Sequence, residues 1–477
     1  MARAWLARCL ALAALCFAVV EKDLPADAAE RDLPADAVRY YRWDADRKIH
    51  AATEAALRAF PKRKHAGKHV QAALGGAGSS AVVLLFGLLF VQPAFLDSKR
   101  NVGFATMLAS VLSNATLPNV LLLHSASGGG CFRDAEGAWL PTTVIAKRAV
   151  SKRRAGHPPA DCGILVPNPY FGDVLHSWKQ RLFDLDRAAK RSPQKRRDPR
   201  VFWRGRLAHH VARGPKSKKG AGGQADCVAE AGNYARLEAA ALSLKRPDLF
   251  DVKCTDPCCC AAQQSNCGSY DAEMRKIASE PTLARGNGSS PLDAVKFRYV
   301  LNLPILADGS PSPNLNHLWA LRAVVLLWTA SYTEWYSPAL QAGETHVEVN
   351  RSNAVRVIAD LNTDEEKRNE LVQGALRVRH TMLCPDCIVG FFLHLVGRIR
   401  SRFGFDAVLD NPQQALDLLR PNNCSGLVQI DFGLKPSGPV RLGRSACDFL
   451  DELVAKREAW LNQPADDTGA LQGFIPG

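Results

Sequence analysis

The sequence predicts an α/β protein of two domains, in which buried parallel strands alternate with helices. The chain has 477 residues, 47% of them apolar, which is enough for two domains of ordinary size. Short continuous apolar runs, such as VLLL at 120–123 and VVLLW at 324–328, are typical of strands buried on both faces. Segments with helical spacing of apolar residues lie between such runs, at 104–112 and 388–403. Strands that alternate with helices favour parallel sheets covered by helices.

The order of these elements predicts five parts. The first twenty residues carry Arg3, Arg8 and a short apolar run that is too short to span a membrane, so we expect a signal peptide. A charged, Ala-rich stretch follows, with the repeat DLPADA at 23–28 and 32–37. The predicted parts are a signal peptide (1–20), a stalk or N-terminal extension (21–78), a first lobe (79–195), a second lobe (196–410, with a Cys-rich insertion at about 214–290) and a C-terminal extension (411–477).

The cysteines favour an oxidising compartment. The chain has 14 cysteines, and an even number remains after the signal peptide is removed, which suggests disulfides. Five crowd the stretch 254–267, and Cys384 and Cys387 form a CPDC pair. Zinc is less favoured because regularly spaced CxxC pairs are missing, and a redox role is less favoured because no thioredoxin-sized domain surrounds the pair. We therefore expect the secretory pathway lumen, the endoplasmic reticulum or Golgi, or secretion.

The positive charge is confined to one segment. The formal net charge is +14, and residues 147–219 hold 20 Lys and Arg against 5 Asp and Glu, so the rest of the chain is nearly neutral. This segment joins the two predicted lobes, where it would attract an anionic ligand or an acidic glycan. A nucleic-acid partner would suit the charge alone, but the secretory start argues against it.

Several well-marked classes of enzyme are excluded. The sequence has no GxSxG, HExxH, GxxxxGK[ST] or GxGxxG motif, which removes the strongly signalled hydrolases, zinc proteases and P-loop proteins. The carboxylate pairs at 44–46 (DAD) and 184–186 (DLD) do not follow a buried strand. We therefore interpret both pairs as surface residues and predict no metal site.

Two segments carry residues suited to a nucleotide. In VFWRGR, Arg204 and Arg206 flank Gly205 directly after an apolar strand, and guanidinium groups at a strand end suit a diphosphate. The second segment has Ser312 and Asn314 before a short helix, a buried strand, and then Glu334 in an aromatic turn. A helix N-terminus is a ready anion site and a carboxylate beyond a strand can hold ribose hydroxyls. An ordinary βαβ unit with Glu334 as a cap is the alternative.

Taken together, these segments resemble glycosyltransferase family 90, the capsule-associated-protein-like and Rumi-type protein O-glucosyltransferase group, from about Val82 to Phe403. LPNVLLLHSASGG resembles the family's Leu-Pro-Asp strand, GILVPNPYFGD its Ile-x-x-Pro segment, and VFWRGR its Phe-x-Arg-Gly motif. KFRYVLNL, VVLLW, YTEWY and THVEV follow in the family's order. Each match is weak alone, but their common order over this length is specific.

The resemblance implies a GT-B-like fold of two Rossmann-like lobes with parallel sheets and an intervening cleft. It implies metal-independent transfer of a sugar from a nucleotide sugar, usually a UDP-sugar acting as co-substrate, with no cofactor. Phe202, Arg204, Gly205 and Arg206 would then lie at the donor diphosphate, with Glu334 near the nucleoside. The implied partners are the nucleotide sugar and a protein or glycan acceptor, without nucleic acid or a stable membrane span.

The chain departs from the family pattern at two places. The family's Asp base position reads as Ser127, and a neutral Ser cannot remove a proton unless another group activates it. The Ser-Trp-Arg triplet before the second lobe's helix reads Ser312, Pro313 and Asn314, and Asn brings no charge. Asp134 or Asp173 could supply a relocated base. We therefore expect a glycosyltransferase acting on a protein or glycan hydroxyl, and the alternative is a catalytically weakened member that binds a sugar nucleotide or glycan.

Overall fold

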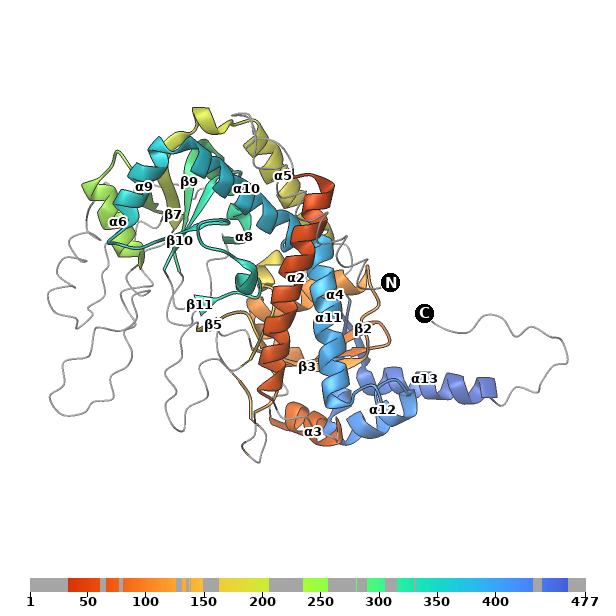
Figure 1. Cartoon of the computed structure of the whole chain (residues 1–477). Coiled ribbons are helices and arrows are strands. Elements are labelled where there is room, and N and C mark those ends of the chain that lie inside the picture. The colour runs from red at the N-terminus through yellow and green to blue at the C-terminus, as the bar shows by residue number, and fades with distance from the viewer. Residues whose placement is uncertain are drawn as a thin grey trace, which may run out of the picture.

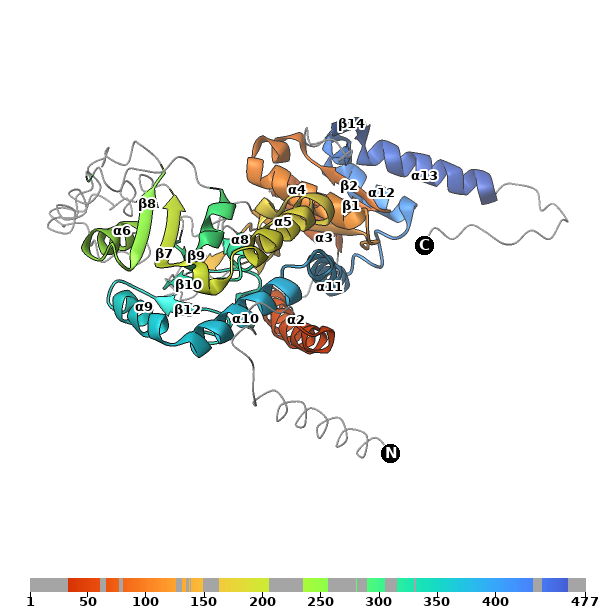
Figure 2. The same ribbon diagram turned by 90° about the horizontal axis from the view of Figure 1, so that it is seen from above.

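The computed structural model arranges the chain in two lobes, each built on its own sheet. It describes residues 33–60, 66–76, 80–125, 131–133, 137, 139–148, 163–205, 235–255, 280, 290–304, 315–329, 332–431 and 440–461. One lobe holds a seven-stranded sheet and the other a five-stranded sheet, and the two lie side by side when seen from above (Figure 2). The predicted signal peptide and most of the Cys-rich insertion lie outside the described residues.

The second lobe confirms the predicted parallel sheet. Its strands run in the order β12-β10-β9-β7-β8, and all four pairings are parallel. Read from β8 to β12, with the five strands renumbered in chain order, this is the order 2-1-3-4-5. It is one of the two common strand orders of doubly wound α/β sheets. The strands are β7 (Asp198–Gly205), β8 (Phe250–Cys254), β9 (Phe297–Asn302), β10 (Val324–Trp328) and β12 (Val347–Val349).

Both faces of this sheet are buried. On β7, Val201 and Trp203 join the apolar cluster under the outer helices, whereas Phe202 joins the larger cluster that continues into the first lobe. The outer helices are α6 (Ala235–Lys245), α9 (Ala354–Thr363) and α10 (Glu365–Thr381), and Figure 1 shows them around the sheet. Burial on both faces explains why these strands read as continuous apolar runs in the sequence.

The first lobe's sheet is mixed, so the prediction of a parallel sheet is wrong for four of its six strand pairings. β3 (Val120–Ser125), β4 (Thr142–Val144) and β6 (Ile164–Leu165) are parallel, but β1 (Ala81–Leu85) is antiparallel to β2 (Leu88–Val91) and to β3. The cause is a two-residue hairpin. Phe86 and Gly87 both have positive φ, 49° and 79°, as this tight turn requires, and Asn119 Oδ1 accepts a bond from the Phe86 N–H.

The predicted C-terminal extension is part of the first lobe. β13 (Val428–Asp431) pairs antiparallel with β2, and β14 (Val440–Ser445) forms the sheet's outer strand. The helices α12 (Pro412–Leu419) and α13 (Ala446–Leu461) pack together, and a disulfide joins Cys424 to Cys447 of α13. Without β13 the apolar strand β2 would be an open edge, which explains why the lobe needs this segment.

Of the two predictions for residues 21–78, a stalk or an N-terminal extension, the structure contradicts the stalk. Residues 35–58 form the 24-residue helix α2 (Ala35–Arg58), which packs against α10 and α11 (Pro385–Phe403), and Figure 1 shows α2 and α11 running side by side. Its buried residues Ala45, Ile49, Thr53 and Leu57 are four apart and so form one stripe along the helix. A second helix, α3 (Ala66–Gly76), packs on α12. These helices belong to the folded body.

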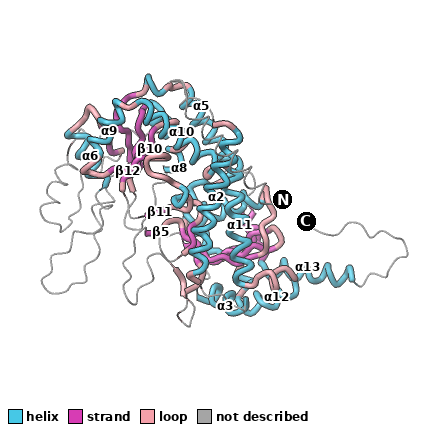
Figure 3. The backbone as a smooth tube through the Cα atoms, viewed as in Figure 1, coloured by secondary structure: helices cyan, strands magenta, loops and turns pink. Residues whose placement is uncertain are grey.

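Helices complete the first lobe and cross between lobes. α4 (Lys99–Leu112) packs on β2, and α5 (Lys179–Lys190) contacts the 3₁₀ turn Pro291–Lys296 of the second lobe. α11 returns from the second lobe and packs on β3, and Figure 3 shows it running from α10 to α12. Asp364 is the N-cap of α10, and its side chain accepts a bond from the Lys367 N–H. Among the described residues no single helix is long and apolar enough to cross a membrane; α10 and α11 pass that test only as a pair, bent by 56°.

Non-covalent contacts also hold the two lobes together. β5 (Lys147–Arg148) of the first lobe pairs antiparallel with β11 (Tyr332–Thr333) of the second. Asp186 of α5 lies 3.0 Å from Arg322 and 2.7 Å from Arg379, both of the second lobe. The DLD pair that we interpreted as surface residues therefore contains a half-buried carboxylate in an ion-pair cluster.

Candidate functional site

The strand order singles out one edge of the second lobe's sheet. From β7 the chain first builds outward to β8 and then returns to place β9 on the other side. At such a reversal the connections leave in opposite directions, and ligands of open α/β sheets bind beyond the carboxyl ends of the two strands. Those ends are Arg204 and Gly205 on β7 and Asn302 on β9.

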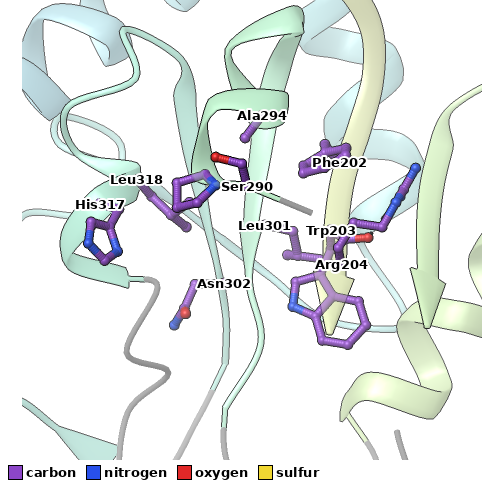
Figure 4. Close-up of a pocket in the computed structure, with 10 residues that line it drawn as sticks. Phe202, Trp203, Arg204, Ser290, Ala294, Leu301, Asn302, His317 and Leu318 are labelled. Atoms are coloured by element: carbon purple, nitrogen blue, oxygen red, sulfur yellow. Dashed lines mark hydrogen bonds between the residues drawn. The ribbon is translucent and has the colours of Figure 1, made fainter. Parts of the chain in front are cut away.

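A pocket lies at this point (Figure 4). The empty space between its walls, including the part that is open to solvent, is about 480 Å³. β7, β9, the 3₁₀ turn Pro291–Lys296 and the helix α8 (Leu315–Leu318) supply its walls. The lining residues are Phe202, Trp203, Arg204, Ser290, Pro291, Ala294, Leu301, Asn302, His317 and Leu318. Two residues of the predicted site, Phe202 and Arg204, are among them.

Arg204 is held firmly at the wall of the pocket. Its Nη2 lies 2.8 Å from Asp251 Oδ2, and its Nη1 donates to the main-chain oxygens of Trp203 and Asp251. The guanidinium carbon lies 4.6 Å from the centre of the Phe202 ring. The side chain is 13% exposed, so one face of a nearly buried cation remains open. Such a fixed guanidinium is well suited to a phosphate oxygen.

Asp251 compensates this charge from the neighbouring strand. Burial opposes ionisation of its carboxyl, but Arg204 and Lys253 outweigh burial and hold the pKa below the usual range. Lys253 Nζ lies 3.3 Å from the other carboxylate oxygen. The group formed by Asp251, Arg204 and Lys253 therefore keeps one net positive charge for an anionic ligand. The sequence did not reveal Asp251, because its pairing depends on the register between β7 and β8.

Gly205 leaves room where the strand ends. A Cβ at this position would lie 2.5 Å from the Trp203 ring, closer than carbon atoms can approach. Glycine is therefore required for Trp203 to lie against the strand. The next residue, Arg206, falls outside the described residues, as do Ser127, Asp134, Ser312 and Asn314.

His317 lines the pocket with an uncharged imidazole. Arg181 Nη1 lies 3.2 Å from its Nε2, and because a guanidinium only donates, the ring nitrogen must accept. Burial, with a smaller contribution from Arg181, lowers the pKa of His317 to about 4. The imidazole is therefore uncharged at neutral pH and carries its hydrogen on Nδ1.

Asn302 provides a further polar group that sequence reasoning missed. It ends β9 on the pocket wall, and its Oδ1 has no hydrogen-bond partner among the described residues. A side-chain amide both donates and accepts, as recognition of a nucleobase or sugar requires. The rule that ligands lie at a strand's carboxyl end would have pointed to it from the run FRYVLNL.

Glu334 is placed differently from the prediction. It is 2% exposed and is not among the residues that line the pocket. The nearby Tyr336 hydroxyl donates to Asn316, so by geometry neither carboxyl oxygen of Glu334 accepts a well-formed hydrogen bond from the described residues. The interaction with Tyr336 opposes only part of the effect of burial on the pKa of Glu334. Burial raises the pKa of Glu334 to about 8. At neutral pH the side chain is a neutral acid in the interior.

We expect Glu334→Gln to flatten the pH dependence of stability. In the native protein the free energy of unfolding falls as pH rises from 4.5 to about 8, because only the unfolded chain ionises this carboxyl in that window. The slope is at most about 1.4 kcal/mol per pH unit. Urea unfolding at several pH values measures it. The exposed Glu348→Gln is the control, and an unchanged slope in Glu334→Gln would contradict the assignment.

Asp173, the predicted relocated base, acts as a helix cap. Its Oδ1 accepts bonds from the N–H groups of Leu175 and His176 and from the Ser110 hydroxyl. Burial opposes ionisation, but these bonds prevail and the pKa of Asp173 is lowered. A carboxylate with a lowered pKa and several donors is a poor general base.

Comparisons with known proteins find no counterpart. The chain matches no protein-family model and no curated protein. The described residues contain no group of three or more His, Cys, Asp or Glu side chains placed to hold a metal ion.

Proposed function

We propose that this protein is a glycosyltransferase that moves a sugar from a UDP-sugar to a hydroxyl of a protein or glycan acceptor. One observation carries the proposal: the pocket at the reversal point of the parallel sheet, with a nearly buried Arg204 in its wall. The resemblance of the motifs to glycosyltransferase family 90 supports the choice of donor. The GT-B-like arrangement of the lobes is part of the same proposal.

The residues have distinct roles in this proposal. Arg204 would bind the diphosphate and stabilise the negative charge that develops on the departing nucleotide. Asn302 would hydrogen-bond the nucleoside, and the Phe202 ring would shield the guanidinium from water on one side. The metal-independent reaction then relies on protein cations alone. The disulfides Cys384–Cys387 and Cys424–Cys447 fit an oxidising compartment, which supports a lumenal location for this activity.

A second function is favoured by one feature of the pocket. None of its ten lining residues is acidic, and Asp173 is engaged as a cap. A transferase needs a base for the acceptor hydroxyl, so a sugar-nucleotide-binding module that lacks turnover fits the described residues as well.

Two measurements on the purified chain test these functions. Calorimetry with UDP, with ADP as the comparison, should show preferential UDP binding. Incubation with UDP-sugars should then release UDP by hydrolysis or transfer. Binding with turnover supports the transferase, binding without turnover supports the module, and the absence of UDP binding overturns both.

A further inference from the structure

The CPDC segment lies at the start of α11, at the bend between α10 and α11. Cys384 is the N-cap of the 19-residue helix α11, Pro385 takes its first position, and Cys384 and Cys387 are disulfide-bonded. The segment lies at the 56° bend between α10 and α11, where the chain returns from the second lobe to the first. Neither the pocket nor the proposed transfer uses it.

The two cysteines differ in exposure. Cys387 is 4% exposed, whereas Cys384 is partly exposed at the start of the helix. We therefore expect a thiol from outside to attack Cys384 more readily than Cys387. Thiol–disulfide exchange requires that an attacking sulfur approach one bonded sulfur directly, so access decides which bond partner leaves.

The helix start stabilises the Cys384 thiolate that the completed exchange releases. The Cys387 N–H donates to Cys384 Sγ at 3.1 Å, and the first N–H groups of a long helix present partial positive charge. A thiolate at Cys384 would keep this bond and gain from the helix field, as reactive cysteines at helix N-termini do.

The other described disulfide, Cys424–Cys447, is more deeply buried and closes a longer loop. Cys424 is completely buried, and its bond to Cys447 closes a separation of 23 residues. The CPDC bond closes a separation of only three. Because a short loop loses little chain entropy when closed, the CPDC bond restricts the unfolded chain less than the Cys424–Cys447 bond. Stabilisation of the fold therefore explains the Cys424–Cys447 bond better than it explains the CPDC bond.

We propose that Cys384 and Cys387 form a redox-active pair that exchanges with a dithiol substrate or partner. A thiolate of the dithiol attacks Cys384 Sγ, the Cys384–Cys387 bond breaks, and Cys387 leaves as a thiolate that takes up a proton. The second thiol of the reagent then attacks the mixed disulfide and releases the Cys384 thiolate. Two electrons pass from the dithiol, which becomes a disulfide, to the protein.

Graded reduction of the folded full-length chain tests this proposal. The protein is incubated with increasing dithiothreitol, alkylated and mapped by peptide mass spectrometry, with circular dichroism to confirm that it stays folded. Cys384 and Cys387 should be modified at a dithiothreitol concentration at least about tenfold below that needed for Cys424 and Cys447. Reduction of both pairs together, or of the CPDC pair last, overturns the proposal.

A matched pair of variants tests the order of attack. Cys387→Ser leaves the accessible Cys384 as a thiol, and Cys384→Ser leaves the buried Cys387. With oxidised glutathione, Cys387→Ser should form the mixed disulfide at least about tenfold faster. Equal rates, or faster reaction of Cys384→Ser, would contradict the assignment of Cys384 as the reacting sulfur.

Discussion

Replacing Arg204 by alanine is expected to weaken UDP binding by about ten- to a hundredfold, because a hydrogen bond to a charged group contributes about 1.5–3 kcal/mol. Arg204 lies in the pocket wall with only 13% of its side chain exposed, so water screens its charge little. Calorimetry with UDP measures the change. Arg204→Lys should recover part of the affinity, since it keeps the charge and loses the two-pronged geometry.

The ion pair with Asp251 supplies a test that separates binding from stability. If Arg204 binds the diphosphate, Arg204→Ala lowers UDP affinity, whereas Asp251→Asn, which removes a competing carboxylate, does not lower it. If the pair is only structural, both substitutions lower stability and neither changes the affinity. Urea unfolding of each variant, measured alongside, distinguishes the two cases.

Arg200 provides a matched control on the same strand. It lies near the opposite end of β7 and is also paired with an acidic residue, Asp198, at 2.6 Å. Arg200→Ala should leave UDP binding unchanged, because the residue is remote from the strand's carboxyl end. Equal losses in Arg204→Ala and Arg200→Ala would overturn the donor-site assignment.

The second lobe could be predicted from sequence because its strands are buried on both faces. A run such as VVLLW needs no partner to be recognised. Arg204 was predicted from its place at the end of the strand VFWRG, and Phe202 from the family resemblance. Asp251 could not be found in this way. Its role comes from the alignment of β8 beside β7, where Phe202 lies opposite Asp251, and no local pattern sets that register.

The sheet of the first lobe was predicted wrongly for a related reason. β2 pairs with β13 across more than three hundred residues, and no window of the sequence carries that pairing. Gly87 marks a break in the apolar run 81–92, which is compatible with one or two strands. Because the usual Asn-Gly signal is missing, the run does not show that the chain reverses there. The helix α2 was not predicted because its segment is rich in charged residues. The four-residue spacing of Ala45, Ile49 and Leu57, which marks its buried side, was nevertheless present in the sequence.

Replacing Gly374 by alanine is expected to destabilise the protein strongly. Gly374 lies on the buried side of α10, and a Cβ there would lie 1.8 Å from the main-chain oxygen of Glu344. The opposing atoms are backbone in a turn braced by Thr345, whose Oγ1 accepts a bond from the Gln341 N–H. Since no side chain can rotate away, the helix and the turn must separate. Alanine favours a helix by about 1 kcal/mol over glycine, but overpacking of this kind costs about 3 kcal/mol or more.

The neighbouring helix supplies the matched control for that substitution. Gly390 lies inside α11, and nothing lies within 4 Å of a Cβ built on it. Gly390→Ala should therefore raise the free energy of unfolding by up to about 1 kcal/mol through helix propensity alone. Urea midpoints of the two variants should move in opposite directions from the native value. If Gly374→Ala were as stable as Gly390→Ala, α10 could not lie against the 341–346 turn as closely as described, and the packing that fixes the second lobe beside α2 would have to be revised.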